Sequence, residues 1–160
     1  MISSLNLKYA RTINFCISLL FIFYVAVIGL LCFYPLTANL NSDSNSVETF
    51  KMIGKAPVIV TPLVEMTDFS FYLNILMTVP FGIFVLSLFK KHLALFSLGA
   101  ISFGLGLLIE SMQFVLDNLD LMTRFVDIND VFANALGVQI GYLITFAFYK
   151  FVRKRFTEGL

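Results

Sequence analysis

Four long runs of apolar residues dominate the sequence, and each has the length of a membrane-crossing helix. They cover approximately residues 13–34, 72–89, 93–115 and 130–149. Because a bilayer core takes about 20 consecutive apolar residues in a helix, we predict an all-α integral membrane protein with four transmembrane helices. The first run exceeds the roughly 7–15 apolar residues of a signal peptide, so we expect it to remain as a span.

The composition supports an integral membrane protein. Hydrophobic residues make up 59% of the 160-residue chain and charged residues 13%, whereas soluble domains average about 45–50% and about 25%. The net charge of +1, without a clustered basic face, argues against a nucleic-acid partner. We expect one domain over residues 1–160, with the lipid bilayer as its surroundings.

The basic residues predict an orientation. Eight of the eleven Lys and Arg residues lie at the two chain ends or in the turn between the second and third runs. Because cytoplasmic loops carry an excess of Lys and Arg, we predict that both termini are cytoplasmic. The loops at 35–71 and 116–129 are then extracellular. The first of these is long, and we expect a disordered polar half followed by an interfacial segment; an alternative is that residues 56–66 form a lid over the outer face.

Polar side chains gather at the predicted outer ends of the second, third and fourth runs. They are Asn74, Glu110, Gln113, Arg124, Asp127, Asp130 and Asn134. Ionisable residues at membrane depth are functional candidates by default, so we predict that these residues form a ligand-binding cluster. A charge at the bilayer centre costs about 2.5–3.5 kcal/mol, which pairing with Arg124 or protonation would offset for Glu110.

Residues spaced three and four apart form a small and polar face on the last two runs. On the third run this face carries Gly99, Ser102, Gly106, Glu110 and Gln113. On the fourth run it carries Asp127, Asp130, Asn134, Gly137 and Gly141. Because small residues let membrane helices approach closely, we predict that these two runs pack together at Gly106 and Gly137 and open into a polar pocket beyond.

The second run is expected to supply a third wall of this pocket. Asn74, Thr78 and Gly82 lie four residues apart on it, which places them on one helix face. Pro80 removes one backbone hydrogen bond from the same run, so we expect a kink there.

Structural roles also account for several of these residues. Asp127 is a suitable helix N-cap, and Asp130 would then occupy the third helical position, where a carboxylate suits the helix dipole. Asn134 is suited to joining helices by hydrogen bonds. Arg124 is suited to binding a lipid phosphate. These roles and a ligand-binding role remain alternatives at the level of sequence.

The available side chains limit the chemistry. The sole histidine, His92, lies in the predicted cytoplasmic turn, which argues against a zinc hydrolase or a Ser-His-Asp site at the outer face. Glu110 is a candidate general base. Asp127 and Asp130 are weak candidates for Mg²⁺ or Ca²⁺, and we predict neither a metal nor a cofactor. Cys16 and Cys32 would lie roughly 24 Å apart on one helix, too far for a disulfide between them.

The ordered motifs resemble the VanZ-like family of small bacterial membrane proteins. The matching segments are NILMTVPFGIFV at 74–85, LLIESMQ at 107–113 and RFVDINDVFANALGVQIG at 124–141. The family pattern then falls on Asn74, Pro80, Gly82, Glu110, Gln113, Arg124, Asp127, Asp130, Asn134, Gly137 and Gly141. The resemblance covers about residues 60–141, the motif-bearing part of the chain.

The resemblance implies a multi-pass protein of the bacterial cytoplasmic membrane. The family's namesake is linked to low-level resistance to teicoplanin, a lipoglycopeptide antibiotic that acts outside this membrane. Our leading hypothesis is that the polar pocket binds an envelope precursor or a glycopeptide antibiotic, contributing to resistance or envelope homeostasis. One alternative is an intramembrane enzyme on a lipid or cell-wall precursor, with Glu110 as its base. A small oligomeric transporter ranks last, because the polar residues do not continue across the membrane; a homo-oligomer is possible but not indicated.

Overall fold

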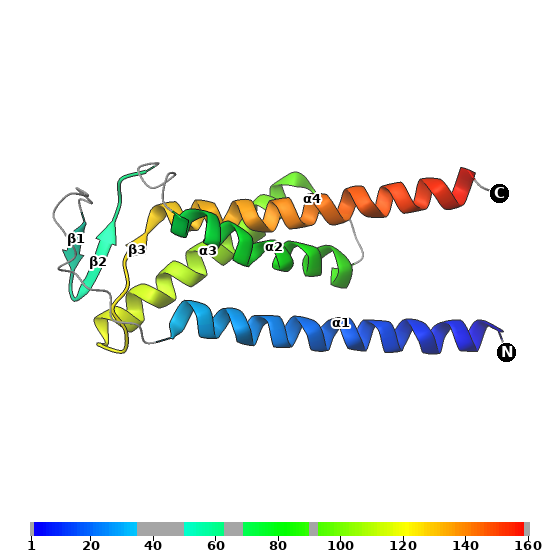
Figure 1. The fold of residues 1–160 in the computed structure, drawn as a ribbon, viewed down its shortest axis with the longest axis horizontal. Helices are drawn as coiled ribbons and strands as arrows, with labels where there is room; N and C mark the ends of the chain where they lie inside the picture. Colours follow the sequence, from blue (N-terminus) through cyan, green and yellow to red (C-terminus); the bar gives the residue numbers. More distant parts are fainter. Residues whose placement is uncertain (1, 35–49, 63–68, 90–92, 159–160) are drawn as a thin grey trace.

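The structure, a computed structural model, describes residues 2–34, 50–62, 69–89 and 93–158. It contains the helices α1 (Ile2–Phe33), α2 (Phe69–Phe89), α3 (Leu95–Asn118) and α4 (Ile128–Glu158). Its strands are β1 (Lys51–Ile53), β2 (Ala56–Ile59) and β3 (Val126–Asp127). The helices form an elongated bundle, and the strands lie at one end of it (Figure 1).

All four helices are long and apolar enough to cross a membrane, so the prediction of a helical protein with four membrane spans is confirmed. The start of α1 and the end of α4 are both at the end of the bundle opposite the strands (Figure 1). Two helices are longer than their predicted spans: α1 begins at Ile2 instead of about residue 13, and α4 continues past residue 149 to Glu158. The last turns of α4 contain Lys, Arg and Glu, which are good helix formers, so the helix outlasts its apolar run.

The three strands form a small sheet that the sequence reading missed. β1 pairs antiparallel with β2, and β2 pairs parallel with β3. Gly54 turns the chain between β1 and β2 with a φ of 66°, a conformation that glycine adopts without a steric penalty. Residues 51–53 and 56–59 are therefore ordered strands, and whether this segment lies at the membrane interface stays a prediction. The rest of that prediction, over 35–49 and 63–68, lies outside the described residues.

The sheet is fixed to the end of α3. Lys55 donates its backbone N–H to Asn118 Oδ1 at 3.0 Å, and its ammonium group forms an ion pair with Asp120. Asp120 has a positive φ of 57°, so the chain turns sharply there as it leaves α3. These contacts hold the β1–β2 hairpin against the end of α3.

Glycines bring α2 and α4 into close contact. A Cβ atom at Gly82 would collide with the Val138 carbonyl oxygen, and one at Gly141 would collide with the Val79 carbonyl oxygen. Gly137 likewise lies against Thr78 and the Ile75 carbonyl. The prediction that Gly137 packs against the third span is therefore wrong, because it faces α2 instead.

The contact between α3 and α4 lies nearer the sheet. A Cβ at Gly106 would lie 2.6 Å from the Val131 carbonyl oxygen, which confirms Gly106 as a close-packing residue with a different partner from the predicted one. Ser102 is fully buried and donates to the Leu98 carbonyl at 2.6 Å. Around Gly99, no described atom lies within 4 Å of the position of an added Cβ, so the close contact does not continue along the whole predicted face.

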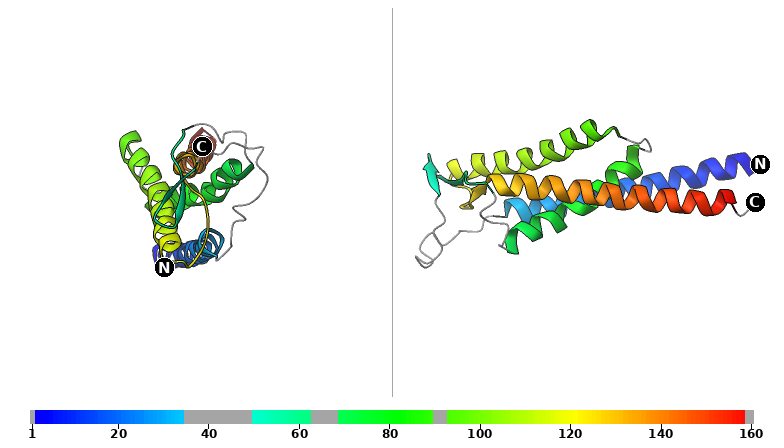
Figure 2. Two further views of the ribbon diagram at one scale, coloured as in Figure 1. Left: turned by 90° about the vertical axis from the view of Figure 1, so that its left-hand side faces the viewer. Right: turned by 90° about the horizontal axis from the view of Figure 1, so that it is seen from above.

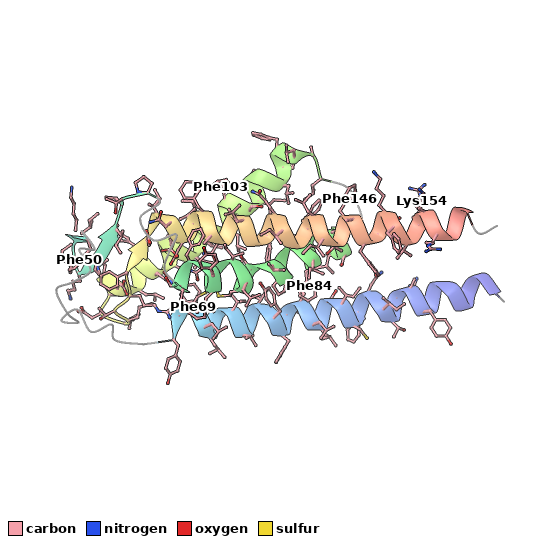
Figure 3. The ribbon with its side chains drawn as sticks, turned by 45° about the horizontal axis from the view of Figure 1, so that its top comes forward. Phe50, Phe69, Phe84, Phe103, Phe146 and Lys154 are labelled. Carbon is pink, nitrogen blue, oxygen red and sulfur yellow. The ribbon has the colours of Figure 1, made fainter. Side chains whose placement is uncertain are left out.

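α1 lies on the side of the bundle opposite α4, and it contacts α2 and α3 (Figure 2). Phe84 of α2 points toward α1 (Figure 3), where its ring packs against Phe21 and Tyr24. The Tyr24 hydroxyl donates to the Met77 carbonyl at 2.8 Å. Most other large α1 side chains are exposed, as expected for a helix that faces lipid.

Candidate functional site

A cavity of about 720 Å³ lies where α1 meets α2 and α3, near the sheet. One part of its wall is polar and contains Asn74, Glu110, Gln113, Arg124, Asp127 and Asp130. The rest is largely apolar and includes Val27, Ile28 and Leu31 of α1, Leu73, Leu76 and Met77 of α2, and Ile109 of α3. The cavity thus presents both polar and apolar groups, as an amphipathic molecule requires.

The polar part is organised around the start of α4. Asp127 Oδ1 accepts the backbone N–H of Asn129 at 2.9 Å, which is the hydrogen bond expected of a helix N-cap. Asn129 Nδ2 also donates to this oxygen and to the Thr61 carbonyl, which ties the chain after β2 to α4. Asp130 occupies the third helical position. Both structural roles proposed for the two aspartates are therefore present.

Glu110 connects α3 to the same helix start. Its Oε2 accepts the Asp127 backbone N–H at 3.0 Å, and its side chain is buried. Among the described residues Glu110 and Arg124 form no direct ion pair, so pairing with Arg124, the first of the two proposed ways to offset the Glu110 charge, is absent. The bond to Asp127 instead fixes the position of one carboxylate relative to the other.

Arg124 and Gln113 bind the end of α1. Arg124 Nη1 donates to the carbonyls of Leu31 and Cys32 at 3.2 and 3.0 Å, and Gln113 Nε2 donates to the Cys32 carbonyl at 3.2 Å. The last carbonyls of a helix have no partners within it and carry partial negative charge. A guanidinium group satisfies them well, so these two side chains attach α1 to the rest of the bundle.

Asn134 lies one turn farther along α4 than Asp130 and is not part of the cavity wall. Its side chain is fully buried, and neither of its polar amide atoms has a hydrogen-bond partner among the described residues. The Thr78 hydroxyl, which has one proton to donate, lies 2.9 Å from the backbone carbonyls of both Asn134 and Asn74. The helix-joining role predicted for Asn134 is therefore filled by its backbone and by Thr78.

The remaining predicted residues are Pro80, which lines the cavity, and four glycines, which pack helices together. Pro80 lies within α2, which remains helical through it, and Pro80 also lines the cavity. Gly82, Gly106, Gly137 and Gly141 serve helix packing. The residues predicted as a ligand cluster, except Asn134, therefore share one cavity, and their function as a binding site remains a prediction.

Several residues at the site were missed by the sequence reading. α1 supplies a wall through Tyr24 and Cys32, although nothing in that run marks it as functional. Asp117 is buried, and its carboxylate accepts the Arg124 backbone N–H at 3.3 and 3.4 Å. Asp117 lies four residues after Gln113 and continues the polar face of the third run, so the sequence held a signal for it.

Carboxyl groups and sulfur atoms line the cavity, but they do not converge into a metal site among the described residues. Cys16 is exposed and Cys32 is buried, and both are free thiols. Cys32 Sγ lies 3.6 Å from Met77 Sδ. Within the described part of the chain, no three His, Cys, Asp or Glu side chains are placed to hold a metal ion, so Asp127 and Asp130 gain no further support as metal ligands.

The family described as VanZ/LLP1 matches residues 21–149 of the chain. This range contains all the residues that line the cavity and extends the resemblance seen in the motifs into α1. Comparison with curated proteins and with solved structures gave no match.

Proposed function

Since the chain belongs to the VanZ/LLP1 family, we propose that it acts at the outer face of the bacterial cytoplasmic membrane by binding an amphipathic molecule. The ligand is a lipid-linked envelope component or a teicoplanin-type lipoglycopeptide. Binding contributes to antibiotic resistance or to homeostasis of the envelope.

The observation that carries this proposal is the mixed polar and apolar wall of the cavity. Carboxyl, amide and guanidinium groups line it together with aliphatic side chains of α1 and α2. An acyl chain and a polar head group need these two surroundings side by side. The exposed apolar faces of α1 and α2 would place the cavity within reach of lipid.

The proposed outer location follows from charge. Lys150, Arg153, Lys154 and Arg155 lie on the last turns of α4, far from the cavity, and Lys154 is seen there in Figure 3. Cytoplasmic loops and ends of membrane proteins carry the excess of Lys and Arg. With that end in the cytoplasm, the cavity and the sheet belong to the outer half of the membrane.

Lipid retention by the purified full-length chain tests this function. Leu73 lines the cavity and is 47% exposed, whereas Leu143 of α4 is 55% exposed and lies away from it. We expect Leu73→Trp to fill part of the cavity and reduce binding of defined phospholipids, measured by native mass spectrometry. Leu143→Trp is the matched control and should bind as the unchanged chain does. Equal retention of every lipid tested by both variants contradicts the proposal.

A strain test addresses the antibiotic form of the proposal. Deleting the gene in a teicoplanin-sensitive background should lower the concentration of teicoplanin that stops growth, and the unchanged chain should restore it. Leu73→Trp should restore less than Leu143→Trp does at equal expression. Unchanged tolerance after deletion argues against a role in resistance and leaves envelope homeostasis as the form to test.

The enzymatic alternative is separated from binding by Glu110→Gln. Gln keeps an oxygen that can accept the Asp127 N–H seen at 3.0 Å, so the fold and lipid retention should persist. A general base, however, is lost with the carboxylate. Restored tolerance by Glu110→Gln in the deletion strain supports binding, and a complete loss of function with lipid retention intact supports catalysis.

A further inference from the structure

One buried carboxylate oxygen, on a residue that lines the cavity, lacks a partner in the part of the chain that the structure describes. Asp127 is 2% exposed and lines the cavity. Its Oδ1 accepts two hydrogen bonds from Asn129, but its Oδ2 is buried with no hydrogen-bond partner among the described residues. Buried polar atoms in native proteins nearly always have a partner, so a group outside the described chain is expected to meet this oxygen.

The surroundings indicate the charge of that group. Three carboxyl groups line the cavity, from Glu110, Asp127 and Asp130, against one guanidinium group from Arg124. Arg124 already donates to the two α1 carbonyls, whose partial charge is also negative. The start of α4 offsets part of this negative charge. Even with Glu110 protonated, Asp127 and Asp130 outnumber Arg124, and this excess favours a cation over a second anion, because buried charges require partners of opposite sign.

The geometry points to a primary ammonium group on an amphipathic ligand, seated against Asp127 Oδ2. This inference rests on the proposed function and names the head group that the same cavity takes. A primary ammonium carries three N–H donors and no acceptor, which suits an unpartnered carboxylate oxygen. A bare metal ion suits the site less well, because no three metal-ligating side chains converge within the described ranges. An aminophospholipid and an amine-bearing lipoglycopeptide share this chemistry.

Head groups that differ in one property test the inference. Phosphatidylethanolamine has a primary ammonium, phosphatidylcholine has the same charge without N–H donors, and phosphatidylglycerol has hydroxyls without a cation. With acyl chains matched, native mass spectrometry of the full-length chain should show phosphatidylethanolamine retained about tenfold over the other two. That ratio is what one charge-assisted hydrogen bond provides.

Asp127→Asn is the decisive variant. Asn is as good an N-cap as Asp, so its oxygen keeps the bond to Asn129 while an NH₂ group replaces Oδ2. The preference for phosphatidylethanolamine should then disappear, with an unchanged unfolding midpoint. Asp120→Asn is the matched control, because Asp120 is exposed at the same end of the bundle and lies outside the cavity wall. It should keep the preference.

A second arm uses teicoplanin with its amine free or acetylated. Asp127-dependent binding that requires the free amine supports the inference with the antibiotic as the source, and Asp127-dependent retention of phosphatidylethanolamine supports it with the lipid as the source. Equal retention of all three lipids, together with no amine dependence of teicoplanin, overturns the inference. If Leu73→Trp still lowers retention in that case, the proposed function stands and only the ammonium assignment fails.

Discussion

α4 is attached to α2 differently from the way that α1 is attached to the bundle. α2 and α4 approach through Gly82, Gly137 and Gly141, whose missing side chains let backbone meet backbone. α1 is held by aromatic contacts to Phe84 and by hydrogen bonds to its last carbonyls from Arg124 and Gln113. The cavity lies on the α1 side. Close glycine packing leaves no room for a ligand, whereas polar attachment of a helix end does.

The difference assigns two kinds of work to the family motifs. The glycines build a fixed α2–α4 pair with α3 beside it, and the start of α4 then presents Asp127 and Asp130 at a defined place. Arg124 and Gln113 add α1 to this scaffold and complete the cavity. Variants that weaken one helix attachment at a time test this division.

The largest effect is expected from filling the α2–α4 contact. Gly82→Ala and Gly141→Ala each place a Cβ in collision with a backbone carbonyl oxygen, which no rotamer change can relieve. Each should lower the free energy of unfolding by at least about 1–3 kcal/mol, seen as a lower unfolding midpoint in detergent. The matched control is Gly104→Ala, because nothing described lies within 4 Å of that Cβ. Similar midpoints for Gly82→Ala and Gly104→Ala would refute the close packing.

A smaller effect is expected from releasing α1. Arg124→Ala removes the hydrogen bonds to the Leu31 and Cys32 carbonyls, and bonds to charged groups contribute about 1.5–3 kcal/mol. Cys32 is 2% exposed, so its modification by a maleimide reports opening at the end of α1. With Cys16 replaced by Ala, we expect Arg124→Ala to speed labelling of Cys32 by roughly tenfold or more.

Arg11→Ala is the control for that experiment, since Arg11 is exposed near the other end of α1. It should leave the labelling rate unchanged. If Arg124→Ala and Arg11→Ala label equally slowly, α1 is held by its aromatic contacts, and the Arg124 hydrogen bonds do not control its attachment.

Several of these features could be predicted from the sequence alone. The four spans follow from the apolar runs, because length and hydropathy alone determine which helices can cross a bilayer. The cap at Asp127 and the position of Asp130 follow from local chemistry at a helix start. The polar residues that line the cavity were found because they lie at the same predicted outer level of three spans, where ionisable groups are functional candidates.

Other features depend on tertiary contacts that a sequence pattern does not name. A face of small residues such as Gly137 and Gly141 predicts a close neighbour but not which neighbour, and α2 rather than α3 takes that place. The strands have two to four residues, too few for a periodic pattern. The acceptors that hold α1 are backbone carbonyls, which every residue has, so Cys32 carried no signal.

The smallest effect is expected at Asn134, which belongs to the tightly packed side. Its two amide atoms are buried without described partners, and an unsatisfied buried polar group costs about 1–3 kcal/mol. Asn134→Leu has a similar volume and leaves the backbone carbonyl near Thr78 in place. It should therefore keep or slightly raise the unfolding midpoint, whereas Thr78→Val should lower it by about 0.6 kcal/mol, the average for such bonds in membranes. A strong loss of stability in Asn134→Leu would mean that the amide has a partner, such as buried water, and that the packed side also encloses a polar site.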